Sequence, residues 1–222
     1  GLNVTAAGFW VDLDSELVFV GDAGGTEAND STRRFGFEAE AFWRATDWLT
    51  LDISVTTVHA RFSSAPKGQN WIPNAVEDTL AAGATFTAPS DFTATIRLRR
   101  LGSAPLSEDN AIRSDPTTTV NLRFAKKIGS IELGIDVLNL FDSKDNDITY
   151  FYESRLPYEW QRVGSAGARR PNIAKRLDGD SVGLDESAHL LPPPLLAPSG
   201  VEDIHFHPLE PRMVRLTIGA RL

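Results

Sequence analysis

The sequence MVRLTIGARL, residues 213–222, alternates strictly between apolar and polar side chains. One face of this segment carries Val214, Leu216, Ile218, Ala220 and Leu222, and the other carries Arg215, Thr217, Gly219 and Arg221. Successive side chains of a β-strand point to opposite faces. The segment therefore predicts a strand that lies between an apolar phase and water.

The same alternation recurs along most of the chain. The clearest segments are residues 35–43, 49–55, 80–88, 92–98, 120–124 and 131–137. No apolar face of these segments carries a charge, although 23% of the chain is charged. A Lys or Arg that faces lipid at the bilayer midplane costs ~2–4 kcal/mol, which is the physical reason for such exclusion. An eighth, less regular strand is expected over residues 2–20, with a kink at 12–15.

Short turns and long polar loops alternate between these segments. The short turns are residues 45–48, 88–91 and 127–130, and the long loops are residues 21–31, 63–75, 103–115 and 142–208. Aromatic residues cluster near the strand ends, where transmembrane barrels keep their interfacial girdles. These are Trp10, Trp43, Trp48, Phe62, Phe92 and Phe141. The pattern predicts an all-β fold, an antiparallel up-and-down transmembrane β-barrel segment of about eight strands.

Composition narrows the possible functions. No window approaches ~18 consecutive apolar residues, so the sequence predicts no transmembrane helix. The formal net charge of −8 argues against a nucleic-acid partner. The first residues lack the features of a signal peptide and look like the middle of a strand, so we expect further residues before Gly1.

Catalytic and metal sites find little support in the sequence. We find no phosphate loop, paired-carboxylate signature or nucleophile–His–acid arrangement, so we expect neither an enzyme nor a bound cofactor. His205 and His207 share one face of an extended segment, a spacing that can bind a metal. Only Asp203 accompanies them, and we predict no metal site. Asp142 and residues 145–147 lack the glycine and glutamate spacing of a calcium loop.

Several short motifs resemble those of a known family. The segment VLNLFD, residues 137–142, resembles the asparagine–leucine–phenylalanine–aspartate signature near the end of TonB-dependent outer-membrane receptors. Residues 148–156 (ITYFYESRL), 203–208 and 210–212 resemble the last extracellular loop and the lead into the final strand. The segment IPNA, residues 72–75, resembles a family motif that lies where the chain descends from a long loop into a strand.

The resemblance implies the C-terminal part of a transmembrane barrel over residues 1–222, with the plug domain absent and residues 142–208 as a long extracellular loop. Residues 157–200 lack periodicity and are expected to be partly disordered. The whole receptor would take up a scarce nutrient such as an iron–siderophore across the outer membrane of a Gram-negative bacterium. Its partners would be outer-membrane lipid, the rest of the barrel and plug, the small-molecule ligand, and TonB through a segment outside this chain.

Candidate substrate-path residues follow from this orientation. Arg97 and Arg99 face the lumen by alternation, and Tyr150, Tyr152 and Arg155 lie in the last extracellular loop. Loops on rigid scaffolds carry much of the ligand recognition in proteins. The same residues could instead solvate a wet barrel interior or hold the loop to its neighbours.

Two alternatives remain open from the sequence. The first is an autonomous eight-stranded outer-membrane barrel with a structural or adhesive role. The second is a soluble β-sandwich that acts as a binding module, which would not readily explain uncharged faces on so many strands.

Overall fold

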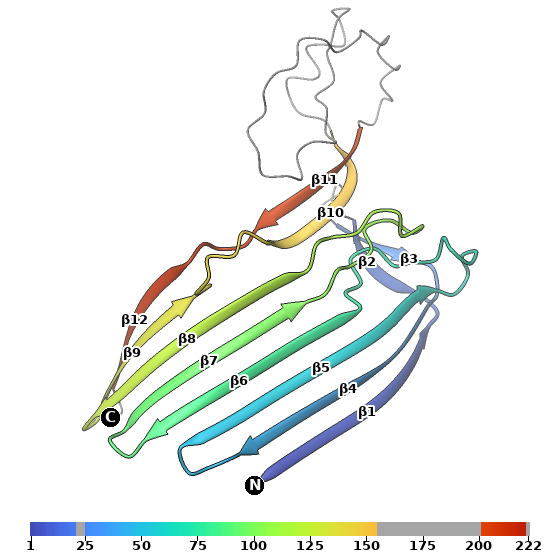
Figure 1. Ribbon diagram of the computed structural model, residues 1–222. Coiled ribbons are helices and arrows are strands. Elements are labelled where there is room, and N and C mark those ends of the chain that lie inside the picture. The colour runs from blue at the N-terminus through green and yellow to red at the C-terminus, as the bar shows by residue number, and fades with distance from the viewer. Residues whose placement is uncertain (21–24, 155–200, 221–222) are drawn as a thin grey trace, which may run out of the picture. The chain divides into compact units, whose positions relative to one another are not determined.

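A computed structural model describes residues 1–20, 25–154 and 201–220. Eight strands form one antiparallel sheet in the order β1-β4-β5-β6-β7-β8-β9-β12 (Figure 1). They are β1 (Leu2–Leu13), β4 (Thr32–Arg44), β5 (Leu49–Phe62), β6 (Asp78–Ala88), β7 (Phe92–Leu101), β8 (Thr117–Ile128), β9 (Ile131–Leu138) and β12 (Met213–Ala220). In the part of the chain that is described, β1 and β12 are the two edges of this sheet. No helix long and apolar enough to span a membrane occurs among the described residues.

Two smaller sheets have two strands each. The first pairs β2 (Glu16–Val20) with β3 (Gly25–Asn29), and the second pairs β10 (Asn146–Ser154) with β11 (Val201–Pro208). By internal contacts the chain divides into one unit of residues 1–151 and 204–222 and a second unit of residues 152–203. Only residues 152–154 and 201–203 of the second unit are described.

The strands agree closely with the sequence predictions. All seven regular segments are strands, and the expected kink is present because β1 ends at Leu13 and β2 begins at Glu16. Two predicted loops were wrong in part. Residues 25–29 form β3, since alternating backbone groups there pair with β2, and the predicted loop 142–208 contains the paired strands β10 and β11. The expected disorder of 157–200 lies outside the described residues.

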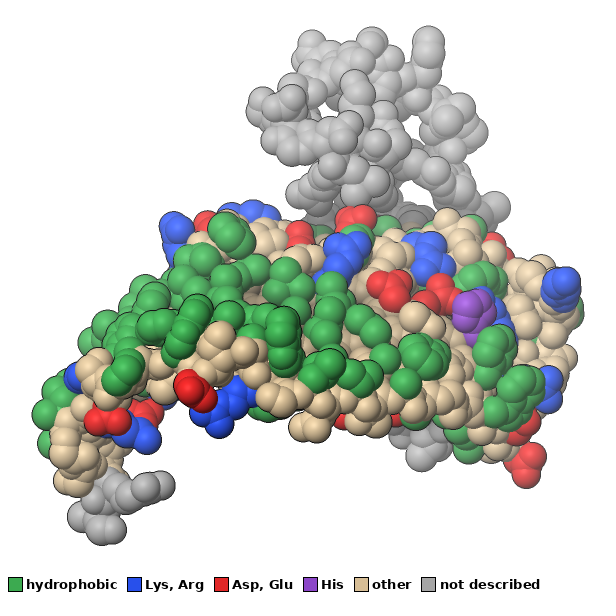
Figure 2. Space-filling view, turned by 60° about the horizontal axis from the view of Figure 1, so that its bottom comes forward, with side chains coloured by type: hydrophobic (Ala, Val, Ile, Leu, Met, Phe, Trp, Pro, Cys, Tyr) green, Lys and Arg blue, Asp and Glu red, His purple; other side chains and the backbone are tan. Residues whose placement is uncertain are grey.

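The register places the apolar faces of all eight strands on one side of the main sheet. A single row of cross-strand partners contains Leu2, Trp43, Leu51, Ala84, Ile96, Leu122, Val137 and Val214. Many of these side chains are exposed, and Leu216 and Ile218 reach 75% and 79%. Figure 2 shows hydrophobic side chains gathered over a wide area. A β-sandwich buries such a face against a second sheet, so these exposures disfavour that alternative.

Two aromatic contacts near the strand ends include Trp48 and Phe92, which belong to the predicted interfacial set. The rings of Trp48 and Phe86 lie 5.6 Å apart, and those of Phe92 and Phe124 lie 6.3 Å apart. Phe62 was predicted to belong to the same interfacial set, and this was wrong. Its side chain is only 3% exposed because it packs with Ala60 and Ile72 on the opposite, polar side of β5.

Gly36 marks a close approach between β1, β4 and β5. A methyl group at Gly36 would overlap the carbonyl oxygen of Thr57 and come within 2.7 Å of the Phe9 ring. Because the Thr57 oxygen is backbone, it cannot move without disturbing the ladder. We expect Gly36→Ala to lower the unfolding free energy by about 2 kcal/mol, a typical cost of overpacking.

Gly8 provides a matched control for this prediction. A methyl group there would have no neighbour closer than 3.9 Å. Gly8→Ala should therefore leave the midpoint of urea unfolding, measured in detergent micelles, close to that of the wild type. Equal losses of unfolding free energy in both variants would show that the close approach at Gly36 does not require a glycine.

Candidate functional site

On the polar face of the main sheet, an ion pair joins two strands across a glycine of the strand between them. Asp52 on β5 accepts a 2.5 Å hydrogen bond from the Arg97 guanidinium on β7. The strand between them, β6, contributes Gly83, and a methyl group there would lie 2.7 Å from the Asp52 carboxylate and 2.9 Å from Arg97. The missing side chain thus leaves room for a bridge between two strands that are not adjacent.

A second network joins β8, β9 and β12. The Asp136 carboxylate on β9 accepts hydrogen bonds from Arg123 at 2.9 Å and from Arg215 at 3.2 Å. Arg123 also contacts Glu132 at 3.3 Å. Asp136 is 5% exposed, whereas the side chains of Arg123 and Arg215 are 41% and 58% exposed. A nearly buried carboxylate therefore links the last strand to the sheet.

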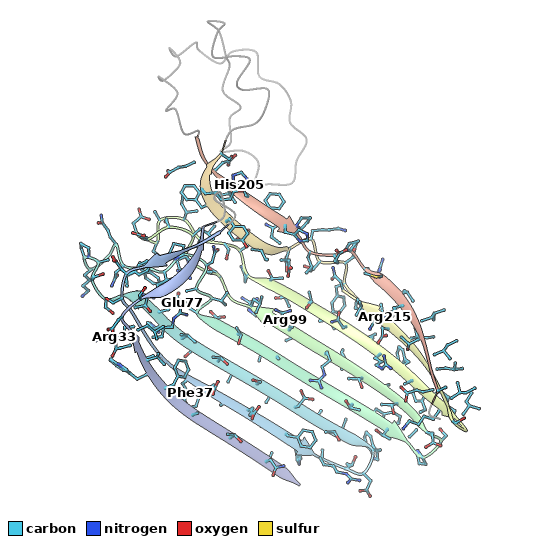
Figure 3. All side chains as sticks on the ribbon, turned by 180° about the vertical axis from the view of Figure 1, so that it is seen from behind. Arg33, Phe37, Glu77, Arg99, His205 and Arg215 are labelled. Atoms are coloured by element: carbon cyan, nitrogen blue, oxygen red, sulfur yellow. The ribbon has the colours of Figure 1, made fainter. Side chains whose placement is uncertain are left out.

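Arg99 differs from the other arginines of the polar face. Arg99, which is labelled in Figure 3, lies on β7 in register with Ala81 of β6 and Thr119 of β8. Its side chain is exposed and forms no ion pair with any described carboxylate. Glu38 and Glu40 of β4 face the same side and are likewise exposed without an ion pair in the described part of the chain. These charges are available to groups outside the described sheet.

Residues 63–77 and 103–115, which we call the paired loops, are held together by a clasp. The Glu77 carboxylate lies between two guanidinium groups, 3.2 Å from Arg61 and 3.0 Å from Arg113. The Trp71 ring lies under the same two groups, with centroid distances of 3.3 Å to Arg61 and 5.6 Å to Arg113. Arg113 also donates to Asn110 at 2.5 Å. Because the clasp contains both charge pairs and stacking, it fixes one loop against the other.

Backbone bonds reinforce this clasp. The Trp71 amide donates to the Glu108 carbonyl at 3.0 Å, and the Asn74 amide donates to the Pro105 carbonyl at 2.8 Å. Asn74 adopts a positive φ of 63°, a conformation that asparagine tolerates better than most residues. Pro105 is fully buried within these loops. The paired loops thus present one ordered surface at this end of the sheet.

Removing the central carboxylate should loosen the paired loops. We expect Glu77→Gln to raise amide hydrogen exchange throughout residues 63–77 and 103–115, because the two half-buried guanidiniums then lose their shared counter-charge. Mass-resolved hydrogen exchange would measure the change. Asp109→Asn is the control, since Asp109 bonds only within its own turn, to Ser107 and Ala111. Faster exchange in that control and none in Glu77→Gln would contradict the clasp.

The segment 139–142 forms a hydrogen-bonded corner between β9 and β12. The Asn139 side chain donates to the carbonyls of Ser143 at 3.0 Å and Glu210 at 2.9 Å, and accepts from the Ser143 amide at 2.9 Å. The backbone amide of Asn139 donates to the Asn121 side-chain oxygen on β8 at 2.9 Å. Asn139 has φ 48° and is 5% exposed. Through its side chain and its backbone amide, Asn139 therefore connects Ser143, the segment before β12 and β8.

Asp142 completes this corner from the other side. Its carboxylate accepts the Arg212 backbone amide at 2.9 Å and lies 2.8 Å from the Lys144 ammonium. The hydrogen bond from the Arg212 amide, followed by that from Lys144, holds the pKa of Asp142 below its usual range. The carboxylate is therefore ionised at neutral pH and positions the residue that precedes β12.

The remaining predicted substrate-path residues are Tyr150, Tyr152 and Arg155. Tyr150 and Tyr152 lie on β10, and Arg155 lies outside the described residues. His205 and His207 lie on β11, and within the described part of the chain no group of three metal-ligating side chains is present.

Comparison with known proteins places this arrangement in a family. The family described as TonB dependent receptor-like, beta-barrel matches residues 1–140. The chain belongs to the TonB-dependent receptor β-barrel family. Its members are transport receptors and not enzymes, as the sequence predicted. The polar face of the main sheet is accordingly the lumenal face, and the apolar face is the outer face of the barrel wall.

Solved structures of similar fold include two receptors named for ferric ligands and a copper transporter. The ferric yersiniabactin uptake receptor FyuA from Yersinia pestis aligns with a TM-score of 0.56 at 16% identity, covering 69% of this chain and 24% of that one. The ferric-catecholate import receptor Fiu from E. coli aligns with a TM-score of 0.52 at 19% identity, covering 65% of this chain and 22% of that one. The copper transporter OprC aligns with a TM-score of 0.52 at 19% identity, covering 65% of this chain and 24% of that one.

These likenesses concern the fold, since the identities are low. The chain spans about a quarter of the length of these structures. A comparison with curated protein sequences finds no match.

Sequence reasoning did not predict which carboxylate pairs with which arginine. Asp52 and Asp136 were visible only as acids on the polar face of their strands, and Glu77, the partner of Arg61 and Arg113, lay outside the predicted loops. Gly83 and Gly134 were the available signals, because each occupies a lumenal position beside an arginine. A glycine inside a strand often marks the close approach of another group. Only the register of the paired strands shows which side chain approaches each glycine.

Proposed function

We propose that this chain forms part of the barrel wall of a TonB-dependent receptor in the outer membrane of a Gram-negative bacterium. The continuous apolar outer face, opposite a charged lumenal face over eight strands, carries this proposal. The sheet has unpaired edges at β1 and β12 in the described part of the chain. Such edges are unstable in hydrocarbon, so they require further strands of the same barrel. This disfavours an autonomous eight-stranded barrel.

The proposed cargo is a chelated metal, with an iron–siderophore as the preferred class. This class of cargo is supported by the similar structures described above, of which two are named as receptors for ferric ligands and one as a copper transporter. In the proposed cycle the ligand binds on the extracellular side, and energy from TonB moves a plug that lies outside this chain. Outer-membrane lipid, the rest of the barrel and the plug are the remaining partners.

Arg99 is the best substrate-path candidate of the five predicted residues. Arg97 is engaged by Asp52, whereas Arg99 is exposed on the lumenal wall and forms no ion pair with the described carboxylates. Tyr150, Tyr152 and Arg155 are proposed to contact ligand from the extracellular side. An unengaged guanidinium suits the negative oxygens of a metal chelate.

Uptake by cells tests the proposal directly. A strain that lacks the gene should lose uptake of one radiolabelled ferric chelate from a panel, and the intact gene should restore it. Restoration should disappear when the TonB gene is deleted. Equal uptake in the presence and absence of this gene, for every ferric and copper chelate tested, would overturn the proposed cargo.

A further inference from the structure

Arg100 lies on the outer face of the sheet, at the end of the apolar band. It pairs in register with Leu80 of β6 and Thr118 of β8. The next outward row toward the short turns consists of Ala82, Leu98 and Val120, all apolar. An arginine therefore follows directly after a surface that is suited to lipid.

The guanidinium of Arg100 is not neutralised by the described part of the chain. Its side chain is exposed, and its one hydrogen bond goes to the hydroxyl of Thr118 at 3.2 Å. By contrast, the outward Arg33 of β4 pairs with Asp12 at 2.7 Å. Asp78 lies one row beyond Arg100 on β6 but forms no ion pair with it.

A second cation bounds the same band at its other end. Lys126 of β8 also faces outward, and its ammonium contacts the Ser90 carbonyl in the turn between β6 and β7. Between Lys126 and Thr118 the outward residues of β8 are Val120, Leu122 and Phe124. Arg100 and Lys126 thus bracket the apolar band on neighbouring strands.

We propose that Arg100 binds the phosphate of an anionic membrane lipid. This inference rests on the proposed membrane location. Near the interface an outward arginine costs little compared with one at the bilayer midplane, and its planar group can donate two hydrogen bonds to one phosphate. The acyl chains of the same lipid would lie against Leu98 and Ala82, which are partly exposed, whereas Val120 is buried. Arg100 therefore fixes the depth of β7 in the bilayer.

Neighbouring arginines on opposite faces allow a sharp test. The full-length protein and its Arg100→Gln and Arg99→Gln variants would be placed in vesicles of phosphatidylcholine, with or without phosphatidylglycerol. The measurement is the shift in the thermal unfolding midpoint caused by phosphatidylglycerol. We expect the shift in the wild type and in Arg99→Gln, and its loss to less than half in Arg100→Gln. Arg100→Lys should retain part of it, and inorganic phosphate alone should not produce it.

The contrary outcomes are distinguishable. An unchanged shift in Arg100→Gln, with all proteins inserted in the vesicles, would overturn lipid binding at Arg100 and leave the receptor assignment intact. Loss in Arg99→Gln instead would overturn the assignment of the two faces. Failure of the wild type to enter vesicles would overturn the proposed membrane location itself.

Discussion

Asn139→Ala is expected to lower the unfolding free energy by about 3 kcal/mol, since three hydrogen bonds of a nearly buried side chain are lost at ~1 kcal/mol each. The carbonyls of Ser143 and Glu210 would also lose a donor. Because φ at residue 139 is 48°, alanine would add backbone strain. The variant should therefore weaken the connection between β9 and the segment that leads into β12.

A glycine at the same position separates the two causes. Asn139→Gly loses the hydrogen bonds but tolerates the positive φ, so it should be less destabilised than Asn139→Ala by about 1 kcal/mol. Urea unfolding in detergent micelles would measure both. Wild-type stability of Asn139→Ala would contradict the view that this side chain holds the corner together.

Asp136→Ala is the second variant with a large expected effect. It would leave Arg123 and Arg215 without their shared carboxylate, and breaking a buried ion pair typically costs 3–5 kcal/mol. Both arginines are about half exposed, so solvent screening reduces the expected loss to roughly 2–3 kcal/mol. The loss should be concentrated at β12, which Arg215 connects to β9.

Asp52→Ala is the matched control for Asp136. It also removes a lumenal carboxylate that holds one arginine, but the Asp52 side chain is 25% exposed and that of Asp136 is 7% exposed. The surface pair should be worth less than about 1 kcal/mol. Urea unfolding would compare the two variants, and hydrogen exchange would locate the change. Equal losses would show that burial of Asp136 contributes nothing.

Local sequence pattern was enough to predict the strands of the main sheet and the faces of the regular ones, but not β3, β10 and β11. Residues 213–222 show why, because a period of two with one uncharged face has no helical interpretation. The cross-strand row from Leu2 to Val214 confirms that all the apolar faces point the same way. Phe62 shows the limit of this reasoning. An aromatic residue at a strand end can face an interface or, as here, a buried cluster, and the pattern is the same for both.

The candidate site was predictable only in part, because its pairings are not local. Arg97 and Arg99 both appeared as lumenal cations, yet of these two only Arg97 forms an ion pair with a described residue, Asp52 of β5, across an intervening strand. Likewise, Asn139 was recognised as part of a signature, but its bond to the Glu210 carbonyl joins residues 71 positions apart. Such contacts depend on the register of the whole sheet.

The central claim is that one face of the main sheet lies against lipid and the other lines a wet lumen. This chain contains no cysteine, so single cysteines introduced at residues 92–99 of β7 could carry spin labels. Relaxation by oxygen and by a water-soluble nickel complex would be measured for the full-length protein in vesicles. The account predicts high oxygen accessibility at residues 92, 94, 96 and 98 and high nickel accessibility at the residues between them. Accessibility without this period of two, or with the opposite phase, would contradict the account.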